Sequence, residues 1–121
     1  MKIVLPWPNP KLTPNAKRRT HWRTYQPAIK DDRRTGHLLT YKAFSEGEPL
    51  VHGPLTGEGH IRPVITFYPP DARHRDDDGM IAAFKHLRDG ICDALAVNDR
   101  RFRPHYVIAE PEKPGRVEVV F

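Results

Sequence analysis

The sequence has little of what marks secreted, disulfide-bonded or membrane proteins. Its 121 residues include a single cysteine, Cys92, so no internal disulfide can form and nothing indicates an oxidising compartment. It has no run of about 18 apolar residues, the length that a helix needs to span a bilayer. Residues 1–6 are too few and too soon interrupted by proline to act as a signal peptide. We therefore expect a cytoplasmic protein with no membrane partner.

Histidine pairs that would indicate a zinc site are also missing. None of the seven histidines is followed by another four residues later, the spacing with which a helix presents two imidazoles to zinc. The length is that of one domain, and folding at this size buries roughly two thirds of the surface that the unfolded chain exposes. We therefore predict a single domain over residues 1–121 that needs no disulfide to fold.

Positive charge is plentiful and unevenly distributed. The chain has a net charge of +5 and a pI near 9.6. Much of the excess lies between residues 11 and 34, where two aspartates accompany these basic residues: Lys11, Lys17, Arg18, Arg19, Arg23, Lys30, Arg33 and Arg34. The segment is a candidate phosphate-binding surface. A solvated cationic face, or nucleic-acid binding without catalysis, would explain the same charge.

Three consecutive aspartates, Asp76, Asp77 and Asp78, directly follow the basic residues of the segment 73–75. Three adjacent carboxylates repel one another, so a positive partner is expected among them. The candidates are the neighbouring arginines and a divalent metal ion, for which carboxylate oxygens are suitable ligands. A tight acidic cluster beside a basic surface is the pattern expected of a metal-dependent enzyme that acts on nucleic acid.

The spacing of the apolar residues and the positions of proline and glycine predict a small two-layer α+β domain with the element order β-α-β-α-β-β. Strands are expected at 2–5 and 61–68, and helices at 36–46 and 78–95. The prolines and charges from about residue 9 to 35 predict a long, partly irregular basic loop. Residues 47–59 read as a connection. The last two strands, at 105–109 and 117–121, are predicted to pair with each other as a hairpin.

The helix predicted at 78–95 is amphipathic. At about 100° per residue, one face collects Met80, Phe84, Leu87, Ile91, Ala94 and Leu95, which should pack on the sheet. The opposite face collects Asp78, Lys85 and Asp89 on one solvent-facing ridge. A pair such as Lys85 and Asp89, four residues apart, also decorates many ordinary exposed helices.

The order of these motifs resembles the RusA family of Holliday junction resolvases, which are bacterial and phage-derived endonucleases. The resemblance covers nearly the full chain and is closest to phage-type members, which suggests a prophage setting. The segments that carry it are Ile3-Val4-Leu5-Pro6-Trp7-Pro8, Thr13-Pro14-Asn15-Ala16 with His21-Trp22, Arg73-His74-Arg75-Asp76-Asp77-Asp78, Asp89-Gly90-Ile91-Cys92-Asp93-Ala94-Leu95 and Asn98-Asp99.

The resemblance implies a Mg²⁺-dependent endonuclease that cuts four-way DNA junctions by paired symmetric nicks as a homodimer. It makes Asp76, Asp78 and Asp99 the catalytic carboxylates that hold Mg²⁺. Asp77, between two of them, should point elsewhere. It also makes Arg75 a contact to a DNA phosphate. We expect further DNA contacts from Arg73 and from the basic segment, through Lys17, Arg18, Arg19 and Arg23.

This chain departs from the family pattern at two positions. Gly79 stands where the family usually has asparagine, directly after the aspartates. Ala82 stands where the prototype has an essential lysine, and phage-type members resemble this chain in having a lysine one turn later, which would be Lys85. A catalytically inactive DNA-binding protein of the same fold is therefore one alternative.

A second alternative is an unrelated basic module that binds a nucleic acid such as RNA. In that case the aspartates would form a structural network with Arg73, Arg75 and Arg88.

Overall fold

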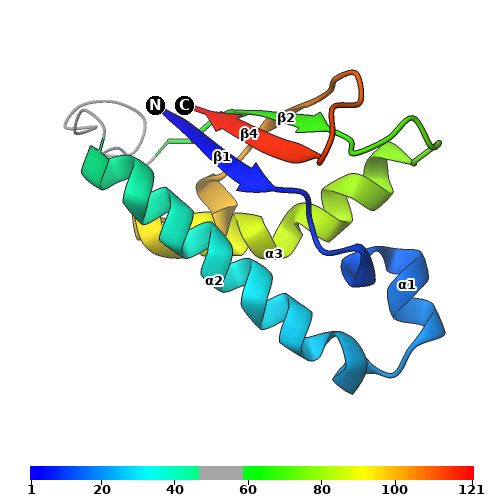
Figure 1. Ribbon diagram of the computed structural model, residues 1–121. Helices are drawn as coiled ribbons and strands as arrows, with labels where there is room; N and C mark the ends of the chain where they lie inside the picture. The colour runs from blue at the N-terminus through cyan, green and yellow to red at the C-terminus, as the bar shows by residue number, and fades with distance from the viewer. Residues whose placement is uncertain (47–58) are drawn as a thin grey trace.

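The structure is a computed structural model that describes residues 1–46 and 59–121. These residues form a small α+β domain with helices on one side of a sheet (Figure 1). The strands are β1 (Lys2–Pro6), β2 (Val64–Tyr68), β3 (His105–Ile108) and β4 (Arg116–Val120). The helices are α1 (Pro14–Arg19), α2 (Trp22–Glu46) and α3 (Asp77–Leu95), with short 3-10 turns η1 (Pro10–Leu12) and η2 (Asp99–Arg101). The predicted α+β class is confirmed.

The sheet is mixed, with the strand order β1-β4-β2-β3. β4 is antiparallel to both β1 and β2, whereas β2 and β3 are parallel. The predicted hairpin of the last two strands is therefore wrong, because β4 lies between β1 and β2 and does not touch β3. This central position gives partners to the backbone groups on both edges of β4, and it fully buries Val117 and Val119.

α3 packs its apolar face against the sheet as the helical periodicity predicts. Met80, Phe84, Leu87 and Ile91 are buried, and the ring of Phe84 meets that of Phe67 on β2 edge to face at 5.6 Å between centroids. Lys85 is exposed on the opposite side of the helix. This packing holds the N-terminus of α3, with its aspartates, at one end of the sheet.

The predicted loop over about 9–35 is wrong, because most of that segment is helical. Two of its prolines, Pro10 and Pro14, stand where a helix begins, whereas Pro27 lies inside α2. Asn9 caps η1 ahead of Pro10, and the Thr13 hydroxyl accepts the Ala16 N–H at 3.2 Å ahead of Pro14. Proline is favourable at a first helical position, because its missing N–H would have no partner there. The predicted helix at 36–46 is confirmed as the C-terminal part of α2.

α2 and α3 cross at two glycines. A Cβ atom on Gly36 would lie 2.1 Å from the carbonyl oxygen of Leu87, and one on Gly90 would lie 2.0 Å from that of Arg33. Neither neighbour can move without moving a helix backbone, so only glycine permits this approach. Of the predicted connection at 47–59, residues 47–58 lie outside the described residues.

Replacing Gly90 with alanine should therefore destabilise the domain by about 2–3 kcal/mol, because the new methyl group would force the two helices apart. Gly79→Ala is the matched control in the same helix. The nearest atom to a Cβ there is the Cβ of Asp76 at 4.0 Å, so this variant should gain up to about 1 kcal/mol from helix propensity. Urea unfolding measures both, and equal stability of the two variants would contradict the crossing.

Candidate functional site

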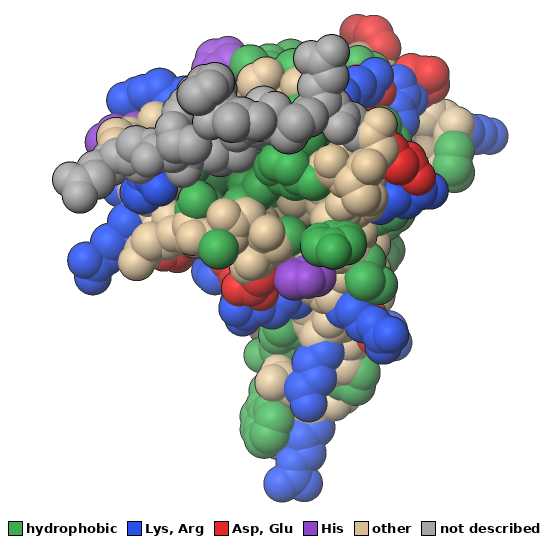
Figure 2. All heavy atoms as spheres, turned by 90° about the vertical axis from the view of Figure 1, so that its left-hand side faces the viewer, with side chains coloured by type: hydrophobic (Ala, Val, Ile, Leu, Met, Phe, Trp, Pro, Cys, Tyr) green, Lys and Arg blue, Asp and Glu red, His purple; other side chains and the backbone are tan. Residues whose placement is uncertain are grey.

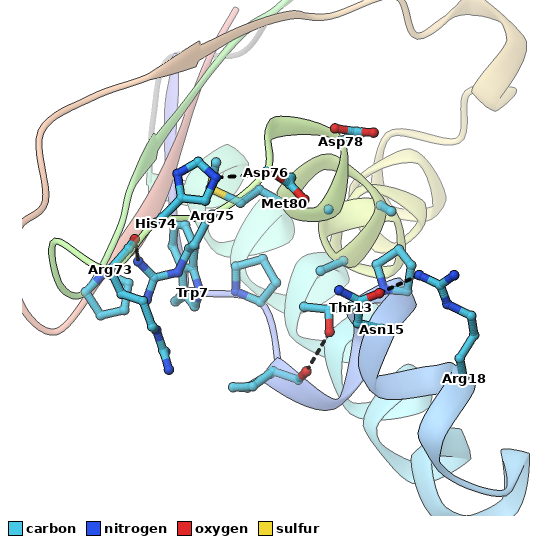
Figure 3. Close-up of a pocket in the computed structure, with 17 residues that line it drawn as sticks. Trp7, Thr13, Asn15, Arg18, Arg73, His74, Arg75, Asp76, Asp78 and Met80 are labelled. Carbon is cyan, nitrogen blue, oxygen red and sulfur yellow. Dashed lines mark hydrogen bonds and ion pairs between the residues drawn. The ribbon is translucent and has the colours of Figure 1, made fainter.

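The start of α3 borders a cavity of about 750 Å³ (Figure 3). Asp76 and Asp78 lie on its α3 side, and Asn15 and Arg18 come from α1. The remaining wall is largely apolar and comes from the chain after β1, the chain after β2 and α3. Its other residues are Trp7, Pro8, Pro10, Thr13, Pro14, Pro70, Arg73, His74, Arg75, Gly79, Met80, Ala82 and Ala83. We call this space the α3 N-terminal cavity.

The aspartates at this cavity are exposed and almost free of partners. Asp76 occupies the N-cap position of α3, but its side chain accepts no capping hydrogen bond. Its one ionic neighbour is His74, with 3.5 Å between Nε2 and Oδ1, and both side chains are largely in solvent. Within residues 1–46 and 59–121, neither Asp77 nor Asp78 takes part in an ion pair. The carboxylates are therefore available to an external cation.

The neighbouring arginines pair with a different carboxylate. Arg75 Nη2 lies 2.8 Å from Asp71 Oδ1, and Arg75 Nη1 donates to the backbone carbonyls of Asp71 and Arg73. The Arg73 N–H also donates to Asp71, and this bond, with the Arg75 guanidinium, holds the pKa of the Asp71 carboxyl below its usual range. Arginines therefore do not neutralise the aspartate cluster.

This pairing overturns the structural network considered from the sequence. In place of Asp76–Asp78, Arg73 and Arg75 contact Asp71, and Arg88 lies over the ring of Phe102, with 5.5 Å between its Cζ and the centroid. The Arg75 side chain is only 16% exposed. The contact of Arg75 with a DNA phosphate stays a prediction. Through its contacts with Asp71, the Arg75 guanidinium stabilises the turn ahead of the aspartates.

A second, smaller concavity of about 330 Å³ lies further along α3. Lys85 and Asp89 border it and form an ion pair, with 2.9 Å between Nζ and Oδ2. Asp99 reaches it from the start of η2, where the Asn98 side chain caps the turn by accepting the Arg100 N–H at 2.9 Å. The other residues lining it are Arg33, Cys92, Asp93, Val97 and Asn98. We call this space the α3 C-terminal concavity.

The thiol in this second concavity is not a nucleophile. Cys92 is buried, and burial raises the pKa of its thiol to about 11, so it stays protonated at neutral pH. The concavity therefore offers an ammonium group and carboxylates as its reactive groups.

The three predicted metal ligands are not brought together within one chain. Asp99 borders the same concavity as Asp89, which follows Asp78 by eleven residues, or about 16 Å of helix. Among the described residues, no group of three His, Cys, Asp or Glu side chains is arranged to hold a metal ion. The reason is the left-handed residue Ala96, which ends α3 and turns the chain back against the C-terminal half of the helix. That Asp76, Asp78 and Asp99 together hold one Mg²⁺ therefore stays a prediction.

Four basic residues of the N-terminal segment, Lys17, Arg18, Arg19 and Arg23, lie where α1 passes into α2. This part protrudes away from the sheet, at the lower end of Figures 1 and 2, and carries lysine and arginine side chains. Lys17 approaches His86 Nε2 at 3.1 Å, Arg18 donates to Asn15 Oδ1, and Arg19 is exposed. Arg23 lies over the ring of Trp22, which is 53% exposed. We call this region the basic arm.

The structure also places residues that sequence reasoning passed over. His86 sits between the basic arm and α3, and its burial, together with the charges of Lys17 and Lys85, lowers its pKa, so it is neutral near pH 7. Trp7 and Asn15 line the α3 N-terminal cavity. In the sequence, both stood only within segments that carry the resemblance, with no role of their own.

No helix among residues 1–46 and 59–121 combines the length and apolar character needed to cross a membrane. No protein-family model matches the chain. An uncharacterized protein of Xylella fastidiosa (strain Temecula1) is 42% identical over 108 residues, which cover 89% of this chain. The chain spans 66% of the length of that relative, whose description names no activity.

Asp93 joins α3 to α2, and its ion pair makes stability depend on pH. Arg33 Nε and Nη2 lie 2.6 and 3.0 Å from its two carboxylate oxygens, and this bond lowers the pKa of Asp93. A lowered carboxyl pKa contributes stability above the unfolded-state pKa that is lost as the pH falls through the folded-state pKa.

We therefore expect Asp93→Asn to destabilise the domain by up to about 1 kcal/mol at pH 7, because the pair is largely exposed. The loss should vanish below the lowered pKa, and it should also vanish in an Arg33→Gln background, where the partner is already gone. Urea unfolding at pH 7 and at a pH below the lowered pKa of Asp93 checks this. A loss that persists unchanged in acid would show that the pair is not its origin.

Proposed function

We propose that this chain is a Mg²⁺-dependent, structure-specific endodeoxyribonuclease of the RusA type, which resolves four-way junctions by paired symmetric nicks in DNA recombination and repair. The observation that carries the proposal is the state of Asp76 and Asp78. They are exposed at the mouth of a cavity, and the adjacent arginines are engaged by Asp71. With the six-residue α1 and the 3-10 turns set aside, the element order strand, helix, strand, helix, strand, strand supports the resemblance.

The donor set suits Mg²⁺. This ion is commonly held by one or two carboxylates together with waters and substrate phosphate oxygens, and Asp76 and Asp78 supply two carboxylates. Bound Mg²⁺ makes a water nucleophilic near neutral pH and stabilises charge on the leaving oxygen. Arg73 and Arg18 border the same cavity as cations that would hold the phosphate backbone.

The remaining predicted catalytic groups, Lys85 and Asp99, belong to the α3 C-terminal concavity. A twofold homodimer whose α3 helices run in opposite directions would bring this concavity of one subunit toward the α3 N-terminal cavity of the other. Each composite site would then take Asp76 and Asp78 from one chain and Asp99 from its partner. Two such sites related by a twofold axis suit the two symmetric nicks of junction resolution.

The basic arm would bind the DNA duplexes beside the cut. Lys17, Arg18, Arg19 and Arg23 supply phosphate contacts, and the exposed ring of Trp22 offers a surface on which an unpaired base could stack. The arm protrudes from the body, so it can enter the centre of a branched substrate (Figure 2).

A catalytically inactive DNA-binding protein of the same fold is the second candidate. Gly79 and Ala82 favour it, because they stand where the family has asparagine and lysine and both line the α3 N-terminal cavity. A nicking assay with Mg²⁺ on a synthetic four-way junction separates the two candidates.

Asparagine substitutions test the aspartates. Asp76→Asn, Asp78→Asn and Asp99→Asn keep the side-chain size but remove the charge that holds Mg²⁺, so nicking should fall by orders of magnitude while junction binding persists. Lys85→Ala should impair nicking with the metal still bound. Asp77→Asn is the matched control and should have little effect. Equal losses at Asp76, Asp77 and Asp78 would mean that bulk charge, and not two particular carboxylates, is used.

Subunit mixing tests the composite site. Mixed Asp76→Asn and Asp99→Asn chains form heterodimers in which one site carries both substitutions and the other carries neither. After random exchange, half of the dimers should hold one intact site each, which restores about one quarter of wild-type nicking. The products should be single nicks. If each site were built within one chain, the mixture would stay as inactive as its components, and the composite site would be refuted.

A further inference from the structure

Part of the wall of the α3 N-terminal cavity carries no charge. Behind the aspartates this part is formed by Trp7, Pro8, Pro70, Met80 and Ala82, of which only Trp7 has a side-chain hydrogen-bond donor, its indole N–H. Its volume of about 750 Å³ lies within the range of sites that enclose small organic molecules. The wall therefore suits an uncharged, flat group.

The aromatic side of this wall is held in place from three directions. Trp7 meets Phe67 edge to face at 6.0 Å, and the Arg75 guanidinium lies over its ring at 5.7 Å. Arg75 is itself held by Asp71. The following segment is tied to α2, because the Asn9 N–H donates to the Asp32 carboxylate at 3.1 Å. Trp7 is thus a fixed surface rather than a side chain that fills the cavity itself.

The polar groups that α1 brings to the cavity are mainly donors. The Thr13 hydroxyl is engaged, since it donates to the Pro10 carbonyl and accepts the Ala16 N–H. Asn15 uses its oxygen to accept from Arg18, which leaves the amide N–H groups of Asn15 and further donors of Arg18 for a ligand. Such donors match the ring nitrogens and carbonyl oxygens of a base edge.

We propose that this cavity binds the base of a nucleotide adjacent to the scissile phosphate, after that base has left the stack. The inference rests on the proposed nuclease function, because it takes the phosphate to sit at Asp76 and Asp78. A base joined to that phosphate through one sugar would then face the wall of Trp7 and Met80. Unstacking costs least where bases are already unpaired, so the cavity favours cleavage at a branch point and reads sequence there through Asn15 and Arg18.

Intrinsic fluorescence tests the base site without any cleavage. The chain has two tryptophans, so a Trp22→Phe variant reports on Trp7 alone. Deoxynucleoside 5′-monophosphates should quench this signal saturably, whereas 2-deoxyribose 5-phosphate, which lacks the base, should not. Equal quenching by the sugar phosphate would overturn the proposal.

A cavity-filling variant makes the test specific. Ala82→Leu places a larger side chain in the cavity and should weaken nucleotide binding roughly tenfold or more, the loss expected when a base no longer stacks on an aromatic ring. Ala94→Leu is the matched control, because Ala94 is a partly exposed alanine of the same helix that borders neither concavity. Equal effects of the two variants on binding would overturn the proposal.

A junction with an abasic analogue beside the scissile phosphate connects the site to cleavage. The wild type should nick it roughly tenfold more slowly than the intact junction, and Ala82→Leu should nick both at this lower rate. Equal wild-type rates on the two junctions would overturn the proposal. If no junction is nicked at all, the nuclease function fails, while the fluorescence titration still decides whether the cavity binds a base.

Discussion

The contact on which the rest of this structure depends is the crossing of α2 and α3 at Gly36 and Gly90. Each glycine lets a backbone carbonyl of the other helix approach to a distance that any side chain would prevent. The crossing fixes α3 against α2, and the apolar face of α3 packs on the sheet. It also sets the direction in which the N-terminal part of α2 leaves the body, and with it the position of the basic arm.

α3 in this arrangement separates two groups of polar side chains. Its start carries Asp76 and Asp78 beside an apolar cavity, and its later turns carry Lys85 and Asp89 near Asp99. Because α3 is a rigid helix, it holds these two groups apart within one chain. The composite site proposed above would overcome this separation by taking Asp99 from a second subunit.

Asp71 keeps the aspartates at the start of α3 from being neutralised by a neighbouring arginine. By engaging Arg75 through its side chain and its backbone carbonyl, it keeps a guanidinium from neutralising the aspartates five to seven residues away in sequence. The same guanidinium lies over Trp7 and fixes one wall of the cavity. One ion pair therefore both leaves the carboxylates available to a cation and shapes the space behind them.

The sequence by itself determined the elements whose signal is local. The 3.6-residue period of Met80, Phe84, Leu87 and Ile91 predicted the buried face of α3, because a helix must bury its apolar stripe whatever it packs against. Only the tertiary structure decided which distant groups meet. The place of β4 between β1 and β2 and the choice of Asp93 by Arg33 depend on long-range packing. The sequence shows which kinds of partner a charged side chain or an apolar strand can have. It does not show which of these partners the fold places beside it.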